Sequence, residues 1–241
     1  MKFPLFSAVI CMMILASCSV DQDIFLNSDG SGTVTGRILL DDFYLNTLTD
    51  LTDLNAPSEG ERTAMDPEMI SAELNRNPYL QNIQISSAAP GIYQGQLSFH
   101  DVEELFYTDE GVESSVLSFH KNNENSTLII RINSDNFQEL FRLFPVLQDP
   151  GFQYFLPEPS ITRSEYIEML LFLFEDQFDR SEDELLLKIE KASLNLTIHT
   201  DGNIISSEGG SLADDNQWRI EIPLLELLLH RKELFYSLTF K

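Results

Sequence analysis

Cysteine is almost absent from this chain. Its two cysteines, Cys11 and Cys18, lie within the first eighteen residues, so the sequence from Ser19 onward carries no thiol. This distribution excludes disulfide bridges, zinc sites with thiolate ligands and cysteine nucleophiles from the rest of the chain. A region of this length can do without such cross-links because it is long enough to bury a large core.

Basic residues are also scarce. The chain has 15 Lys and Arg against 39 Asp and Glu, which gives a formal net charge of −24. Such a surface repels nucleic acid and anionic lipid headgroups, so we expect no electrostatic docking on either. Calcium is an alternative partner for the acids, but residues 27–32 match a calcium-binding loop only in part. A solvated acidic surface is the favoured interpretation.

Long hydrophobic runs are missing too. The apolar stretch Phe3–Leu15 is too short to span a bilayer as a helix, and the six apolar residues of Met169–Phe174 are far too few. The first stretch follows Lys2 and ends in Leu15-Ala16-Ser17-Cys18. This pattern resembles a bacterial lipoprotein signal peptide with its lipobox. The resemblance implies cleavage before Cys18 and fatty acyl chains, such as palmitate, on that cysteine.

The lipobox resemblance fixes the expected domain boundaries and location. Residues 1–17 would be removed as a signal peptide, and residues 18–241 would form one lipid-anchored envelope domain. Two or three acyl chains would hold this domain on the membrane essentially permanently. Ser19 stands where aspartate would resemble an inner-membrane retention signal, so the outer membrane is favoured in a bacterium with two membranes.

The hydrophobic pattern predicts an α+β fold. Alternating residues and turn signals predict strands over 20–27, 33–42, 83–85, 92–99, 116–120, 127–132, 193–199, 204–206, 218–222 and 234–240. Helical spacing and capping signals predict helices over 44–54, from 67, after 101, over 162–174 and over 224–230. We expect a single domain with a largely antiparallel β-sheet and several packed helices.

The arrangement of turns resembles a known group. The lipobox is followed at once by a strand and the turn at 29–32, and later come an Asp201-Gly202 hairpin within 194–207, a Gly209-Gly210 break and the strand at Trp218. This layout is similar to bacterial lipoproteins of the LppM-like domain group over most of the mature chain. The helical block at 137–178 departs from that group. The resemblance implies an envelope domain with an apolar or lipid-related ligand, and it transfers no catalytic residue.

Catalytic motifs give little support for an enzyme. Ser118 and Lys121 have the S-x-x-K spacing of penicillin-binding proteins, and Ser134-Asp135-Asn136 matches their second motif. The first pair lies on a predicted strand, where positions three apart point to opposite faces, and the third motif is absent. No G-x-S-x-G, P-loop or G-x-G-x-x-G stretch is present. We therefore expect a non-enzymatic protein without a cofactor.

The four histidines do not predict a metal site. His100 and His120 end two copies of Leu-Ser-Phe-His, so they could lie at the ends of neighbouring strands. No metal-binding spacing such as H-E-x-x-H accompanies them, and surface histidines are the favoured interpretation. Carboxylate pairs such as Glu103-Glu104 and Glu175-Asp176 are too common in this acidic chain to nominate as a glycosidase acid and base.

The best functional candidate is a phenylalanine-rich block. Residues 137–178 contain eight phenylalanines, and core packing is the favoured explanation of most of them. The alternative is an apolar pocket for a lipid or a docking face for another envelope protein. The candidate residues are Phe141, Phe144, Phe152, Tyr154, Phe155 and Phe172.

We therefore expect a lipid-anchored envelope lipoprotein that binds an apolar ligand or a partner protein near the membrane. The alternative is a structural or assembly subunit of an envelope complex, with no small ligand. An open apolar cavity beneath residues 141–178 would favour ligand binding, and a closed core would favour the subunit.

Overall fold

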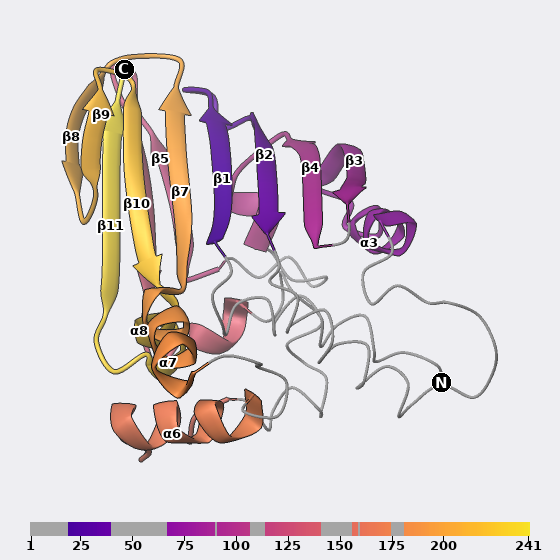
Figure 1. Cartoon of the computed structure of the whole chain (residues 1–241). Coiled ribbons are helices and arrows are strands. Elements are labelled where there is room, and N and C mark those ends of the chain that lie inside the picture. Colours follow the sequence, from indigo (N-terminus) through magenta and orange to yellow (C-terminus); the bar gives the residue numbers. More distant parts are fainter. Residues whose placement is uncertain are drawn as a thin grey trace.

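The first described residues form the expected hairpin (Figure 1). In the computed structural model, β1 (Ser19–Leu26) and β2 (Gly32–Leu39) pair in antiparallel fashion. Asp29 holds the turn, because its carboxylate accepts hydrogen bonds from the hydroxyl and the backbone N–H of Ser31 at 2.6 and 2.9 Å. These bonds stabilise the charged carboxylate and lower the pKa of Asp29. The structure describes residues 19–39, 67–89, 91–106, 114–140, 156–158, 160–174 and 181–241.

β1 lies inside a seven-stranded sheet with the order β3-β4-β2-β1-β7-β10-β9. The other strands are β3 (Leu80–Ala89), β4 (Ile92–Phe99), β7 (Ser193–Thr200), β9 (Ser211–Asp214) and β10 (Gln217–Pro223). All neighbours are antiparallel except β1 and β7, which run parallel with Ser19 beside Ser193. The start of the described chain is thus fixed on both sides by hydrogen-bonded strands.

A second sheet has four strands in the order β5-β6-β11-β8. They are β5 (Leu117–Lys121), β6 (Ser126–Ile132), β11 (Leu234–Phe240) and β8 (Ile204–Glu208). The β5–β6 hairpin confirms the sequence prediction. Together the two sheets and their helices make a single α+β domain that is mostly antiparallel sheet, as expected.

The hairpin predicted around Asp201-Gly202 is wrong. β7 belongs to the large sheet, whereas β8 pairs with β11 in the small one. The backbone of Asn203 exchanges hydrogen bonds with Lys241 at 2.8 and 3.0 Å, so the end of the chain takes the place of the expected strand partner. The turn therefore carries the chain from one sheet to the other.

The helices follow their capping signals. α3 (Pro67–Leu74) begins at the predicted proline, and η1 (Glu103–Phe106) is a short 3₁₀-helix. α6 (Arg163–Phe174) follows a capping box in which the Thr162 N–H donates to Glu165 at 2.7 Å and the Glu165 N–H donates to the Thr162 hydroxyl at 3.2 Å. Within the described ranges, no helix has both the length and the apolar character that a bilayer crossing requires.

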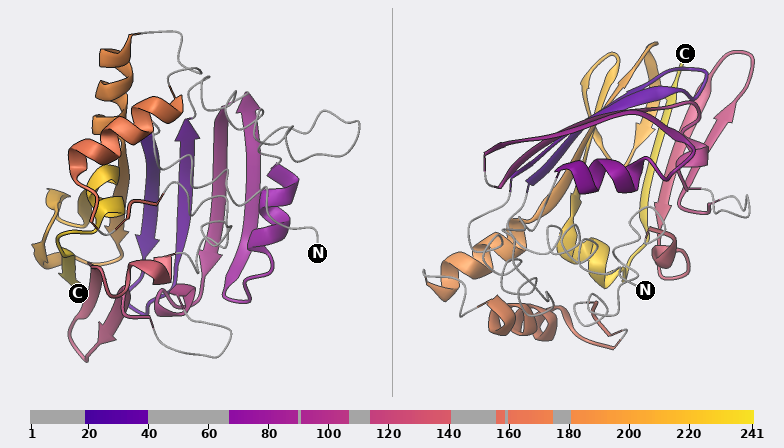
Figure 2. Two further views of the ribbon diagram at one scale, coloured as in Figure 1. Left: turned by 90° about the horizontal axis from the view of Figure 1, so that it is seen from below. Right: turned by 90° about the vertical axis from the view of Figure 1, so that its right-hand side faces the viewer.

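Two further helices complete the fold. α8 (Leu224–Leu229) is short and buried, as expected, whereas the pattern did not predict α7 (Glu182–Lys191). Ser181 caps α7 by accepting a hydrogen bond from the Glu184 N–H at 3.3 Å. Figure 2 shows α6, α7 and α8 gathered at one end of the sheets, while α3 lies by the outer strand β3. Among the described helices, α3 thus contacts β3 and α8 contacts β10, toward opposite edges of the large sheet.

The core joins both sheets to the three clustered helices. Its fully buried side chains, with no more than 1% of their surface exposed, are Leu26, Val116, Tyr166, Leu170, Phe174, Ile189, Ile198, Trp218, Leu238 and Phe240. Burial raises the pKa of Tyr93 and of Tyr236, since it disfavours the phenolate. The helix predicted over 44–54 and the Glu175-Asp176 pair lie outside the described residues.

Candidate functional site

Two rows of polar side chains cross the strands β1, β2, β4 and β3. The first row, read across the pairing register, consists of Asp23, Thr35, Gln96 and Gln84. The second row consists of Asp21, Arg37, Gln94 and Ser86. Because the members of the two rows are two residues apart on each strand, all eight side chains project from the same face of the sheet.

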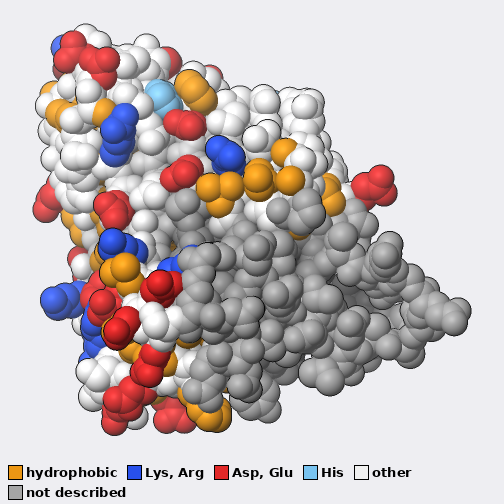
Figure 3. All heavy atoms as spheres, in the orientation of Figure 1, with side chains coloured by type: hydrophobic (Ala, Val, Ile, Leu, Met, Phe, Trp, Pro, Cys, Tyr) orange, Lys and Arg blue, Asp and Glu red, His pale blue; other side chains and the backbone are white. Residues whose placement is uncertain are grey.

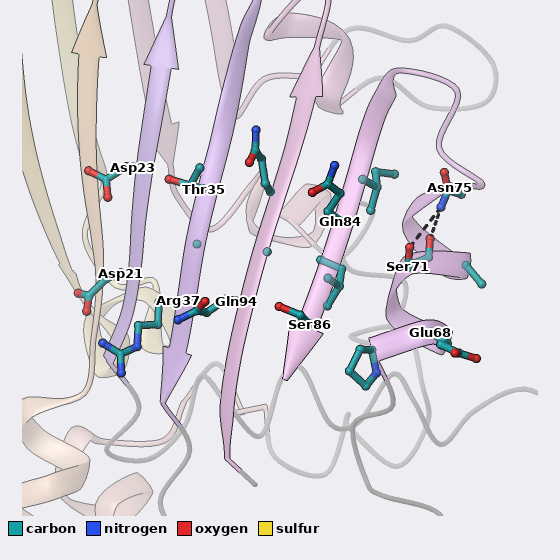
Figure 4. Close-up of a pocket in the computed structure, with 17 residues that line it drawn as sticks. Asp21, Asp23, Thr35, Arg37, Glu68, Ser71, Asn75, Gln84, Ser86 and Gln94 are labelled. Carbon is teal, nitrogen blue, oxygen red and sulfur yellow. Dashed lines mark hydrogen bonds between the residues drawn. The ribbon is translucent and has the colours of Figure 1, made fainter. Parts of the chain in front are cut away.

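These eight residues line a groove of about 1130 Å³ (Figure 4). α3 supplies Glu68 and Ser71, and Asn75 follows its last residue; the spacing of three and four places the three side chains on one side. The Asn75 amide donates a hydrogen bond to the Ser71 carbonyl at 2.7 Å. Small or aliphatic residues complete the lining, namely Gly36, Pro67, Ala72, Ile83, Ile85 and Gly95.

The acidic end of the groove is tied to β7. The Asn195 amide donates a hydrogen bond to Asp21 at 3.1 Å, and His199 Nε2 lies 2.9 Å from Asp23 Oδ1. The His199 ring also stacks on Phe25, with 4.5 Å between ring centres. Phe25 follows Asp23 by two residues on the same face of β1, and 47% of its surface is exposed. An exposed aromatic ring thus adjoins the groove.

The face of the molecule in Figure 3 shows mixed charge. In its coloured part, acidic and basic side chains are interspersed mainly on the left, the upper right is mostly uncharged, and hydrophobic side chains form small groups. The groove itself has the three acids Asp21, Asp23 and Glu68 against one base, Arg37. It is therefore a polar site with an excess of negative charge, unlike the apolar cavity that the phenylalanine block suggested.

Most predicted site residues lie outside the described residues. These are Cys18, Phe141, Phe144, Phe152, Tyr154 and Phe155. The remaining one, Phe172, lies on α6 with 73% of its surface exposed. By contrast, Phe137 and Phe174 of the same block are buried in the core, as the packing explanation expected. The described part of the block thus contains both core and surface aromatics.

Residues of the S-x-x-K and S-D-N motifs have structural partners. Ser118 and Lys121 lie on the strand β5, as expected, and the Lys121 ammonium donates a hydrogen bond to the Asp29 carbonyl. Asn136 is buried, and its amide donates to the carbonyls of Ser115 and Arg131 at 3.1 and 2.8 Å. Lys121 thus joins β5 to the turn at Asp29, and Asn136 joins its own loop to Ser115 and to the end of β6.

The histidines are not brought together as a metal site. His100 follows β4 of the large sheet and His120 lies on β5 of the small sheet, so the suggestion of neighbouring strands is wrong. Among the described residues, no group of three or more His, Cys, Asp or Glu is placed to hold a metal ion.

The sequence contains a signal for the groove that no motif search for catalytic or aromatic residues reveals. Each of the four strands carries two polar residues at a spacing of two, such as Gln94 and Gln96 on β4. A single strand of this kind is an ordinary solvated face. Only the strand order, which joins residues 21–37 to residues 84–96, turns four such pairs into one surface.

Comparisons with known proteins show a distant likeness in structure. No protein-family model matches the chain, and no curated protein sequence matches it. Among solved structures, the chain is similar to the folded domain of LppM from Mycobacterium tuberculosis, determined by NMR. The sequences are 11% identical, the match covers 93% of this chain and 90% of that one, and the TM-score is 0.39. The neighbour is thus an LppM domain, and membership of the LppM-like group remains a prediction.

Proposed function

We propose that this chain is a lipid-anchored lipoprotein of the bacterial envelope, that it binds a ligand or a partner protein close to the membrane, and that it catalyses no reaction. The observation that carries the proposal is the position of β1. This strand begins at Ser19, directly after the lipobox cysteine, and is paired with β2 and β7. Consecutive Cα atoms are about 3.8 Å apart, so an acyl anchor on Cys18 would join the sheet without a linker.

The proposed absence of catalysis is supported by the roles of the candidate catalytic residues. Glu103 accepts a hydrogen bond from the Phe119 N–H at 2.7 Å, and so positions β5 against η1. Lys121 and Asn136 are engaged in loop contacts. These contacts account for the three residues by structural roles, and the proposal assigns them no catalytic role.

For the ligand, we propose that the phenylalanine block binds an apolar or lipid molecule through Phe141, Phe144, Phe152, Tyr154 and Phe155. The exposed ring of Phe172 supports a recognition role, because large apolar side chains on a surface often mark contact sites. The second candidate is an assembly subunit of an envelope complex, in which the same aromatic residues would contact a partner protein and no small ligand would bind.

The anchor is tested by metabolic labelling with a fatty acid analogue in a bacterial host. Cys18→Ser should abolish labelling and release the protein from membranes washed with high salt. Cys11→Ser is the matched control, since this cysteine lies within the predicted signal peptide, and it should keep both properties. Labelling or salt-resistant membrane binding that survives in Cys18→Ser would refute the lipid anchor.

Ligand binding is tested separately by native mass spectrometry of the full chain released from detergent. The proposal expects a co-purifying lipid-sized mass that is lost in a Phe152→Ala/Phe155→Ala variant. Phe235→Ala, on β11, is the control and should retain the mass. A wild-type protein without any bound species would refute the small ligand and favour the assembly subunit.

A further inference from the structure

The polar groove on the large sheet has a chemistry different from that of the phenylalanine block. Its lining contains three primary amides from β3 and β4, a fourth from Asn75 directly after α3, and hydroxyls from β2, β3 and α3. Each amide offers a carbonyl acceptor and two N–H donors, and each hydroxyl can donate or accept. Such groups match a ligand that presents many hydroxyls, each of which is also both donor and acceptor.

Many of these side chains have no internal partner. Within the described part of the chain, no hydrogen bond engages the side chains of Thr35, Gln84, Ser86, Gln94 and Gln96. Their backbones are fixed in paired strands, so the side chains start from regularly spaced positions about 4.8 Å apart across the sheet. A ligand that crosses the strands would meet a new amide or hydroxyl at each step.

Charge narrows the ligand class. The acids Asp21, Asp23 and Glu68 outnumber Arg37 in the groove, and the whole chain has a net charge of −24. Phosphorylated, sulfated and carboxylated ligands would be repelled by this field. Carboxylates accept hydrogen bonds strongly, however, so they favour neutral ligands that donate from hydroxyls.

Size and shape narrow the class further. The volume of about 1130 Å³ lies slightly above the usual range of roughly 300–1,000 Å³ for small-molecule pockets. Four strands span about 14 Å from the first to the last. The ring of Phe25, which stacks on His199 and is 47% exposed, adjoins Asp23 on the same face and offers an apolar surface to the C–H groups of a ring. The site thus suits an extended chain of rings rather than one small molecule.

We infer that this groove is a binding site for a neutral glycan, whose hydroxyls would bond to the amides of β3 and β4 and to the carboxylates of β1. The proposal concerns a different surface from the phenylalanine block and does not require the lipid anchor.

Affinity electrophoresis of the full chain in non-ionic detergent tests the inference, with native gels that contain dextran, mannan or galactan. At least one of these neutral polysaccharides should retard the protein. In a Gln94→Ala/Gln96→Ala variant the apparent Kd should rise about tenfold, because two hydrogen bonds are lost. Gln138→Ala, an exposed glutamine of η2 (Phe137–Glu139), is the matched control and should bind as the wild type does.

Three results would overturn the inference: no retardation by any of the three polysaccharides, equal retardation of the wild type and the double variant, or retardation only by an anionic polysaccharide such as alginate. The near-ultraviolet circular dichroism of Trp218 checks that each variant is folded. Because the gel contains no membrane, these outcomes are independent of the labelling test of Cys18.

Discussion

At the scale of single residues, some glycines stand where a side chain has no room. Gly209 has φ +81°, and a Cβ at this position would lie 2.3 Å from the Phe235 carbonyl oxygen. A side chain there would meet both the left-handed backbone penalty and a backbone clash. Gly36 differs, because its nearest neighbour would be Gln22 Cγ at 3.7 Å.

We therefore predict that Gly209→Ala lowers the free energy of unfolding by at least ~2 kcal/mol and the Tm by about 5 °C or more. Gly36→Ala should change stability by no more than about 0.5 kcal/mol. Thermal unfolding followed by far-ultraviolet circular dichroism measures both. Equal Tm values for the two variants would contradict this reading of the Gly209 turn.

At the scale of elements, features set by residues close in sequence could be predicted, whereas the pairing of strands far apart in sequence could not. The Asp29 turn and the Thr162 capping box are set by residues close in sequence, so the β1–β2 hairpin and the start of α6 could be predicted. The parallel pairing of β1 with β7 joins segments more than 150 residues apart, and the sequence of neither strand indicates its partner. For the same reason the groove, which needs four strands in a set order, could not be predicted.

The missed helix α7 has a similar explanation. Its cap, Ser181, and its acidic first turn are recognisable signals, but they resemble the many other acidic runs of this chain. Its buried residues are Leu185 and Ile189, which face the same way on consecutive turns, and the partly buried Leu186 also packs against the core. The sequence signals of α7 are therefore ambiguous, and its packing against the core distinguishes this helix from the other acidic segments.

The capping box of α6 gives a prediction about pH. Hydrogen bonds from the side chain and the backbone N–H of Thr162 lower the pKa of Glu165. Because the folded-state pKa is depressed, the contribution of this cap to stability is present above the unfolded-state pKa. It is lost as the pH falls through the folded-state value.

In a Thr162→Ala variant the pKa of Glu165 should rise part of the way toward its ordinary value, since the backbone N–H remains. A carboxyl-detected NMR titration of the two proteins measures this difference. An unchanged Glu165 pKa in the variant would show that the Thr162 side chain does not stabilise the carboxylate.

At the scale of the whole molecule, the strand register relates the core to the proposed anchor. Trp218 on β10 is opposite Ile198 on β7, which lies beside Ile24 on β1. Ile24 is five residues beyond Ser19, or about 17 Å along the strand. The acidic groove face disfavours a sheet lying flat on anionic lipid, so we expect the strands to run away from the membrane.

Trp218 is the only tryptophan and is fully buried, so its fluorescence reports this orientation. In the acylated protein bound to vesicles, lipids brominated along their chains should leave the emission unquenched. The spectrum should also match that of the protein in detergent. Strong quenching would mean that the domain lies flat on the bilayer or inserts into it.

With the proposed acyl anchor on Cys18, no linker would separate the anchor from β1, and this would limit what the groove can reach. Asp21 and Asp23 are three and five residues beyond Cys18, so their rows would lie within about 10 and 17 Å of the anchor. A tether this short would keep the domain at the membrane surface. A ligand would therefore have to come to that surface, and lengthening the tether between the anchor and β1 would change which molecules the groove meets without altering the groove itself.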